Sequence, residues 1–336
     1  MRLSSIDTIR TFAILAVVAI HCDPLTGPSQ EYCWGSLGDF IDLICRFAVP
    51  FFLITSGYLL ARRVQSRGTN QTGIMPFIVR MGGLIIVWYG FYLVWPLDWG
   101  LTLENGLLRS TYWNLNTLFK DTTHLLNGPR IHLWFLSALL ISGLHVFLVS
   151  LCRSNRVIFF YFLVIYLAGL ALGPYAMFFS GSLTEITSTG RWTLPPFIIA
   201  IGWLSATQSL RVRFSASLSL VALGTVLTLV EALLLHNLYG TPLSNHDFLM
   251  GTPIQAFGLL QLALNKPELG DQTVLPLLGR YSLGVYATHV AVIDLLDARS
   301  GGSLTWEVMK TFVVYGVTVS VVMVIARSRT LRRFVT

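Results

Sequence analysis

The sequence predicts an all-α membrane protein, a bundle of about ten transmembrane helices with both termini in the cytoplasm. Hydrophobic residues make up 54% of the 336 positions, charged residues only 12%, and the mean hydropathy is +0.67. A soluble domain carries about 25% charged residues. Apolar runs near the ~20 residues that cross a bilayer recur along the whole chain. We therefore expect one integral-membrane domain over residues 1–336.

Ten apolar runs are candidates for these helices. They cover about residues 7–23, 40–60, 76–97, 131–152, 157–174, 192–209, 214–236, 248–264, 274–296 and 308–326. Lys and Arg collect in the cytoplasmic loops of membrane proteins. With the N-terminus inside, fifteen of the 23 Lys and Arg residues fall in inner segments and six in outer segments. This bias supports ten spans, and its scatter over many loops excludes a nucleic-acid surface despite the net charge of +7.

The first run, from Ile6 to Cys22, carries three residues that do not suit lipid: Asp7, Arg10 and His21. At about 100° and 1.5 Å per residue, Arg10 and His21 return to the same helix face, about 16 Å apart along the axis. Asp7 lies one turn before Arg10. Polar groups inside a membrane usually line a cavity or face a partner helix. Taken singly, Asp7 could cap the helix, Arg10 could snorkel to the interface and His21 could hydrogen-bond to a neighbouring main chain. Their shared face favours a functional site instead.

The second run combines an ion pair, a proline and a small-residue segment. Asp42 and Arg46 are spaced i,i+4 and can pair, and Pro50 is expected to kink the helix. The segment Ser56–Tyr58, with its central glycine, would let another main chain approach closely. A tightly packed, kinked helix explains all of these residues without a ligand, and a role in a site is the alternative.

Arginines gather at the inner side of spans two and three. Arg62, Arg63 and Arg67 follow the second span, and Arg80 lies near the inner end of the third. Guanidinium groups bind phosphate through charge-assisted hydrogen bonds. The positive-inside rule requires basic residues at the same place, so this cluster could equally be a membrane anchor.

Histidines and aromatic residues mark spans four and nine. His132 and Trp134 open the fourth span at its outer end, and Tyr286 lies one turn before His289 in the ninth. Each could be a packing contact, or they could together line a polar cavity.

Further aromatic residues surround the longest outer loop, which joins spans three and four: Trp95, Trp99, Tyr112 and Trp113. Tryptophan and tyrosine form belts at membrane interfaces. The alternative is a platform on which a sugar ring stacks.

The sequence lacks the motifs of several enzyme classes. It has no GxSxG elbow, HExxH pair, Walker loop or dinucleotide-binding fingerprint, and its four cysteines lack metal-ligand spacing. We therefore expect no metal and no permanently bound cofactor. Cys22 and Cys33 could form a disulfide if they face an oxidising compartment.

Taken together, these residues resemble the type-three membrane acyltransferases. A hallmark of that family is an arginine, ten residues and a histidine on the first helix, which Arg10 and His21 match. The segment Val49–Leu60 is similar to the family's second helix, HLWFL (His132–Leu136) to a later segment, and YATH (Tyr286–His289) to a late aromatic–histidine motif.

One position departs from that pattern. Many relatives carry two basic residues three apart on the third helix, whereas this chain has Phe77 and Arg80, so only the second is basic. Arg62, Arg63 and Arg67 are candidates for the missing role.

The resemblance implies an enzyme that moves an acyl group, most often acetyl, from cytoplasmic acyl-CoA to a hydroxyl of an envelope carbohydrate or related acceptor such as a lipid-linked saccharide. It would be a multi-pass protein of the bacterial inner (plasma) membrane, with acyl-CoA, the acceptor and the lipid bilayer as partners. The alternative is a transporter, a flippase or a substrate-binding membrane module without acyl transfer, as in racemase-like relatives. We expect no attached racemase or hydrolase domain.

The resemblance and the positions on the first helix together suggest roles. Arg10, at the inner end of the first helix, is expected to bind the donor. Asp7 is expected to orient the Arg10 side chain or to cap the helix. His21, deeper in the membrane, could act as a general base near neutral pH or carry the acyl group as a nucleophile. The catalytic candidates are therefore His21 and Arg10. The other donor-binding candidates are Arg62, Arg63, Arg67, Arg80, Ser56 and Tyr58, and those for the acceptor or the cavity are Arg46, Asp42, His132, Trp134, Tyr286 and His289.

Overall fold

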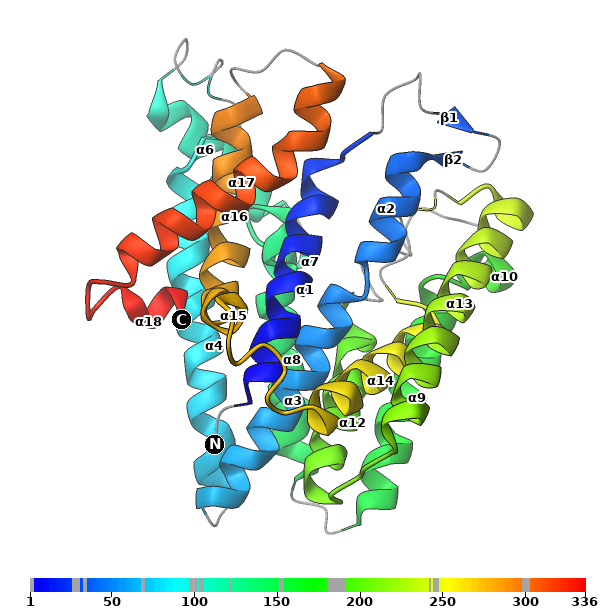
Figure 1. Cartoon of the computed structure of the whole chain (residues 1–336). Coiled ribbons are helices and arrows are strands. Elements are labelled where there is room, and N and C mark those ends of the chain that lie inside the picture. Colours follow the sequence, from blue (N-terminus) through cyan, green and yellow to red (C-terminus); the bar gives the residue numbers. More distant parts are fainter. Residues whose placement is uncertain are drawn as a thin grey trace.

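The computed structural model describes the chain except for residues 1–2, 26–30, 33–34, 68–69, 97–98, 100–101, 103–105, 121, 151–153, 181–190, 242, 244–247 and 298–302. Long helices run side by side through most of the described part (Figure 1). The described strands are two residues long: β1 (Glu31–Tyr32) pairs antiparallel with β2 (Gly35–Ser36). The predicted all-α architecture is therefore confirmed for the described part of the chain.

The helices follow the apolar runs of the sequence. In chain order they are α1 (Ser4–Cys22), α2 (Leu37–Cys45), α3 (Ala48–Arg67), α4 (Asn70–Val94), α6 (Leu107–Leu118), α7 (Thr122–Asn127), the 3₁₀ turn η2 (Ile131–Leu133), α8 (Trp134–Val149), α9 (Asn155–Leu172), α10 (Ala176–Ser180), α12 (Pro195–Thr207), α13 (Phe214–Tyr239), α14 (Gly251–Asn265), α15 (Leu275–Arg280), α16 (Ser282–Asp297), α17 (Leu304–Ile325) and α18 (Arg332–Val335).

Six helical segments of the described chain are long and apolar enough to cross a membrane. They comprise α1, α2 with α3, α4, η2 with α8, α13 and α17. The other four expected runs also form helices, namely α9, α12, α14 and the pair α15–α16, but these are shorter. Ten crossings and two cytoplasmic termini therefore stay predictions.

The second run is two helices rather than one kinked helix. Helix α2 ends at Cys45 and α3 begins at Ala48, so the chain bends at Arg46. Pro50 lies in the first turn of α3, where its missing N–H removes no helical hydrogen bond. A proline ring clashes with the carbonyl four residues earlier, which here is that of Arg46, so the disruption expected from Pro50 takes the form of a break between α2 and α3.

The ninth run is also divided, and its first part packs along the N-terminal half of α1. The Thr8 hydroxyl donates to the carbonyl of Leu269 (2.9 Å) and the Thr11 hydroxyl to the carbonyl of Leu275 (2.6 Å). Irregular main chain at membrane depth requires such partners. The short helix α15 is thereby held against α1, next to Arg10, and α16 continues beyond it.

Helices α3 and α12 approach closely through glycines. A side chain at Gly57 of α3 would collide with the main-chain oxygen of Ile199, and one at Gly202 of α12 with that of Ile54. The close approach predicted for the segment Ser56–Tyr58 is thereby confirmed. Contact between two main chains fixes the position of α3, which forms one wall of the site described below.

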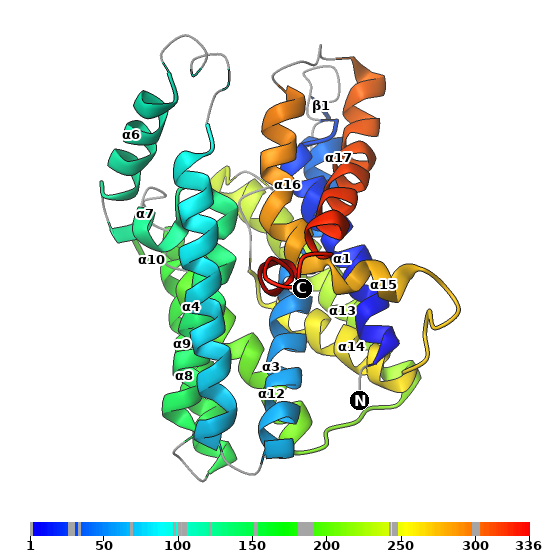
Figure 2. The ribbon, with the colours of Figure 1, turned by 90° about the vertical axis from the view of Figure 1, so that its left-hand side faces the viewer.

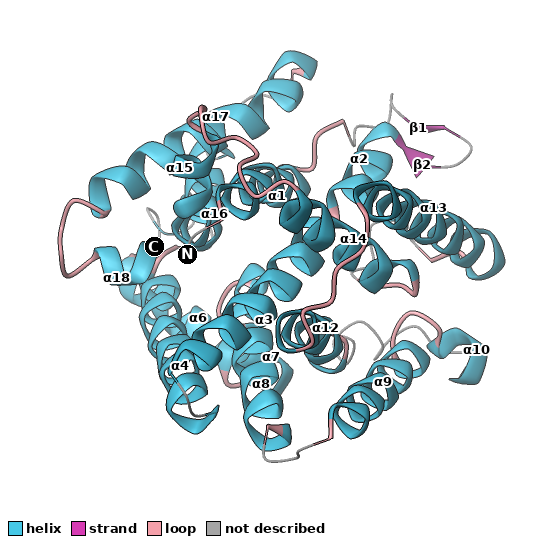
Figure 3. Cartoon of the chain, turned by 60° about the horizontal axis from the view of Figure 1, so that its bottom comes forward, coloured by secondary structure: helices cyan, strands magenta, loops and turns pink. Residues whose placement is uncertain are grey.

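The arrangement places α1 at the centre. In Figure 2, α4, α8 and α9 lie on one side and α1, α15, α16 and α17 on the other, with α3 between them. Viewed from below, α1 and α3 lie inside the ring of helices, whereas α13 lies at its rim (Figure 3). Accordingly, 67% of the apolar stretch of α1 is buried inside the protein, whereas only 17% of the apolar stretch of α13 is buried. The residues of α1 therefore face protein on most sides.

Candidate active site

A cavity of about 390 Å³ lies among α1, α3, α4, α8, α15 and α16. Four arginines, from four different helices, contribute to its lining, and none of the described lining residues is acidic. Apolar side chains such as Phe52 and Leu139 line its length. At its other end lie His21, His132, Trp134 and Tyr286. The cavity therefore joins a basic end to a histidine end.

The separation of the two ends follows from helix geometry. Arg10 and His21 both line the cavity from α1. Eleven residues of α-helix separate them by about 16 Å along the axis. Phe52 and Arg63, which line the cavity from the antiparallel helix α3, are also eleven residues apart. Two helices thus set the same span between the two ends.

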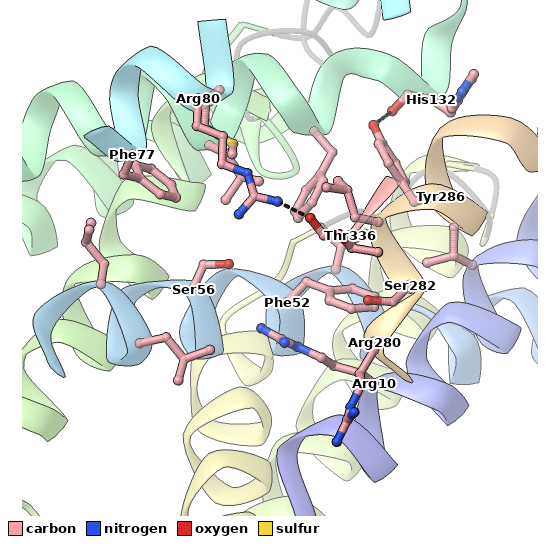
Figure 4. Close-up of a pocket in the computed structure, with 18 of the residues that line it drawn as sticks. Arg10, Phe52, Ser56, Phe77, Arg80, His132, Arg280, Ser282, Tyr286 and Thr336 are labelled. Atoms are coloured by element: carbon pink, nitrogen blue, oxygen red, sulfur yellow. Dashed lines mark hydrogen bonds between the residues drawn. The ribbon is translucent and has the colours of Figure 1, made fainter. Parts of the chain in front are cut away.

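The basic end consists of Arg10 on α1, Arg63 on α3, Arg80 on α4 and Arg280 on α15. Figure 4 shows Arg10 and Arg280 on one side of the cavity and Arg80 on the opposite side. The Arg10 guanidinium lies 3.4 Å from the carboxylate of Asp7. Arg63, Arg80 and Arg280 are exposed. Converging guanidinium groups without acidic neighbours in the lining suit a polyanion.

An oxygen atom already occupies a donor position of Arg80. Its guanidinium donates to the main-chain oxygen of Thr336, which also lines the cavity (Figure 4). The Trp88 indole donates to the carbonyl of Phe334 (3.2 Å). These two bonds hold the segment around α18 beside the basic end.

Three imidazole rings meet at the histidine end. The ring centroid of His21 lies 4.8 Å from that of His289 and 6.1 Å from that of His132, and His132 and His289 are 5.2 Å apart. His289 is 0% exposed and His132 2%. Among the described residues, no group of three or more His, Cys, Asp or Glu side chains is placed to hold a metal ion.

Hydrogen bonds to the main chain set two of the tautomers. The Nδ1 atom of His21 lies 2.8 Å from the carbonyl oxygen of Val17, and Nδ1 of His289 lies 2.7 Å from that of Tyr286. A carbonyl oxygen only accepts, so both Nδ1 atoms carry the proton and both Nε2 atoms present a lone pair. A neutral imidazole in this tautomer can take a proton or attack a carbonyl carbon at Nε2.

Four of the eight expected donor-binding residues line the cavity, and Arg10 and Arg80 are two of them. Arg63 and Ser56 line it, whereas neighbouring Arg62 and Tyr58 do not. The side chain of Arg67 lies outside the described residues. Arg63, in the last turns of α3, is therefore the arginine next to the second span that lines the cavity together with Arg80. Asp7 does not line the cavity, but its carboxylate pairs with the Arg10 guanidinium.

The expected position of Arg46 in this cavity is corrected. Arg46 pairs with Asp42 as the spacing predicts, with Arg46 Nε 2.6 Å from a carboxylate oxygen. Both residues, however, lie away from the main cavity, and Arg46 lines a void of about 10 Å³ beside Thr225 and Gln255. The cause is the bend between α2 and α3, which directs Arg46 towards α13 and α14.

The late aromatic–histidine motif is arranged differently from the expected pair. The Tyr286 hydroxyl donates to the main-chain oxygen of His132 rather than to His289. His289 uses the Tyr286 carbonyl instead. Tyr286 and Trp134 line the cavity, and His289 lies behind His21.

Arg280 is the main lining residue that the sequence analysis did not single out. In the sequence it is one of the fifteen basic residues assigned to inner segments, nine residues before His289. Separately, the expected disulfide of Cys22 concerns Cys33, which lies outside the described residues.

Comparisons with known proteins identify the family of the chain. A family model described as an acyltransferase domain matches residues 3–327. The chain is 26% identical to an amino-acid racemase of Enterococcus faecalis, over 89% of this chain and 42% of that protein. It is also 26% identical to a serine/alanine racemase of Enterococcus gallinarum, over 79% of this chain and 37% of that protein.

The chain thus spans less than half the length of these curated relatives. No solved structure matches it. The family model covers α1 to α17, including both hallmark residues and every described helix that contributes to the cavity. This multi-pass membrane chain belongs to the acyltransferase 3 family.

Proposed function

We propose that this protein transfers an acyl group, most often acetyl, from cytoplasmic acyl-CoA to a hydroxyl of an envelope carbohydrate or lipid-linked saccharide at the bacterial inner membrane. The observation that carries this proposal is the lining of the cavity. One end has four arginines and no described acidic residue, and the other end has His21 in its Nδ1–H tautomer.

The basic end suits the phosphates of CoA. Guanidinium groups bind phosphate bidentately, and arginine stays charged at any cellular pH. The arm of CoA between its thioester sulfur and its diphosphate contains about thirteen bonds, which reach about 15 Å at the length per bond of an extended backbone. Arg10 and His21 are separated by about 16 Å along α1. A donor held at Arg10 could therefore present its thioester to His21.

His21 supplies the proton transfer that the reaction requires. The acceptor oxygen attacks the thioester carbon, the C–S bond breaks, and the hydroxyl proton passes to His21 Nε2 and then to the leaving thiolate. In the alternative sequence, Nε2 attacks first and carries the acyl group until the hydroxyl displaces it. The products are an ester and a thiol in both sequences.

Proteoliposomes provide the test. The protein is oriented so that its basic end faces the vesicle lumen. Acetyl-CoA labelled on its acetyl group is enclosed in the lumen, and envelope glycan is supplied only outside. Thiol should appear inside and labelled ester outside, both only when the protein is present. Failure to consume acetyl-CoA in the presence of envelope glycan would refute the proposal.

The similarity to racemase-named proteins favours one alternative, a transport or binding module for small polar molecules. Such a module would move or bind its ligand without releasing thiol from acetyl-CoA. The same vesicles separate the two functions, because thiol release and ligand movement are measured independently.

A further inference from the structure

A second polar cluster lies beyond the histidines, on the side away from the arginines. We name Trp95, Trp99, Asn114, Arg130 and Asp294 the outer cluster. We propose that the outer cluster is the acceptor subsite and that it binds a pyranose ring, one hydroxyl of which is directed to the histidines. This inference rests on the proposed function, since it assigns the acceptor of the same reaction.

An ion pair forms the centre of the outer cluster. Arg130 Nη2 lies 2.6 Å from a carboxylate oxygen of Asp294, and the Trp95 indole donates to the same oxygen at 3.2 Å. The two charged side chains are only 13% and 14% exposed. Removing charged side chains from water costs free energy unless they pair with each other or bind a ligand. Their alternating donors and acceptors match the neighbouring hydroxyls of a sugar.

Three members of the outer cluster have polar atoms that are buried and without a hydrogen-bond partner. These are Oδ1 of Asn114, Nε of Arg130 and the indole nitrogen of Trp99. Asn114 is 2% exposed, and its amide nitrogen is already used by the carbonyls of Leu93 and Trp95. A buried polar atom without a hydrogen-bond partner is destabilising. A ligand that supplied both donors and acceptors would recover this free energy.

The outer cluster adjoins the histidine end. Asp294 follows His289 by five residues on α16, and Arg130 precedes His132 by two residues. Tyr92 lies between, with its hydroxyl donating to the carbonyl of Ala287 and its ring 5.1 Å from that of His132. The Nε2 atom of His289 and both ring nitrogens of His132 also lack hydrogen-bond partners. Unsatisfied groups therefore continue from the outer cluster to the ring that contacts His21.

The mixture of groups selects the class of ligand. Trp95 and Trp99 lie edge to face at 5.3 Å, and the Phe91 ring stacks on Trp95 at 5.2 Å, so aromatic surface gathers at the outer cluster. A pyranose offers C–H faces for the indoles and hydroxyls for the ion pair and the amide. A small amino acid such as serine has a hydroxyl but no such face, and it would bring a second carboxylate towards Asp294.

Binding is tested on the purified full chain in lipid nanodiscs. Methyl β-D-glucopyranoside is the probe, L-serine is the comparison ligand, and tryptophan fluorescence reports occupancy. A separate titration measures acetyl-CoA. The glycoside should give a saturable change and L-serine none. Absence of a saturable glycoside response would overturn the subsite, whereas absence of acetyl-CoA binding would refute the proposed function instead.

Two matched pairs of variants assign the response to the outer cluster. Asp294→Asn should weaken glycoside binding about 10–100-fold, the loss of a charge-assisted hydrogen bond. Asp297→Asn, three residues further on the same helix, should not. Trp99→Phe should weaken binding, whereas Trp113→Phe, at an exposed position of α6, should leave it unchanged.

The donor titration serves as the folding control for every variant. Acetyl-CoA affinity should stay within about twofold, because the arginines lie beyond the histidines from the outer cluster. If Asp294→Asn loses acetyl-CoA binding as well, Trp99→Phe decides. Unchanged glycoside binding in Trp99→Phe, or an equal loss in Trp113→Phe, would overturn the proposal.

Discussion

The two ends of the cavity differ in how they treat charge. At the basic end, Arg63, Arg80 and Arg280 are exposed, so their charges are hydrated when no ligand is bound. At the histidine end, His132 and His289 are almost completely buried. An isolated buried charge costs far more than a buried neutral group. The first end is therefore suited to hold an anion, and the second to keep neutral nitrogen bases out of water.

This difference separates binding from chemistry along one helix. The α1 helix carries Arg10 at one end and His21 at the other, about 16 Å apart. A single group of ligand atoms cannot contact both side chains. If the comparison is correct, substitutions at the two ends should change different kinetic constants.

The largest effect is expected at the histidine end. His21→Ala should lower kcat about 10²–10⁴-fold, the usual contribution of a general base, and leave donor affinity nearly unchanged. Steady-state kinetics and a separate acetyl-CoA titration measure the two quantities. His145→Ala is the matched control, because His145 pairs with Tyr161 outside the cavity. Wild-type turnover in His21→Ala would remove His21 from the chemistry.

A smaller effect is expected at the basic end. Arg10→Ala should weaken acetyl-CoA binding by about 1.5–3 kcal/mol, the range for hydrogen bonds to charged groups. Arg10→Lys should recover only part of this loss, since an ammonium cannot bind a phosphate bidentately. The measurement is the KM for the donor with kcat recorded beside it. A fall in kcat at unchanged KM would contradict the division between the two ends.

Helical periodicity predicted the arrangement on α1 well. The shared face of Arg10 and His21 depends only on the rise and turn of one helix, so spacing alone suffices. The i,i+4 pair of Asp42 and Arg46 and the close approach at Gly57 are equally local. All of these features were found in the structure where the sequence placed them.

The remaining features depend on where helices break. Arg280 reaches the cavity because the ninth run divides and α15 packs on α1. The Thr11 hydroxyl on α1 donates to the carbonyl of Leu275 at the start of α15, and these two residues are 264 positions apart in sequence. Arg46 lies away from the cavity because the helix breaks completely there, four residues before Pro50, and does not merely kink. Hydropathy alone does not distinguish one long helix from two short ones, so neither position could be predicted.

A change outside both ends should affect them together. Gly57→Leu would force α3 away from the main chain of Ile199, and we expect it to lower stability by about 1–3 kcal/mol. Because α3 lines both ends of the cavity, KM and kcat should change together. Thermal unfolding in detergent measures the first effect. Gly90→Ala is the control, since no described atom outside its own helical turn lies within 4 Å of the added carbon.

The smallest effect tests the border of the basic end. Arg62 and Arg63 are consecutive and both exposed, but only Arg63 lines the cavity. Exposed ion pairs contribute about 0–1 kcal/mol, so Arg63→Ala should raise the donor KM by at most about fivefold. Arg62→Ala should change it less. Since the Debye length shortens from about 30 Å at 0.01 M salt to about 8 Å at 0.15 M, the difference should be clearest at low ionic strength. Equal effects of the two substitutions at every salt concentration would mean that a general positive surface, and not the lining of the cavity, attracts the donor.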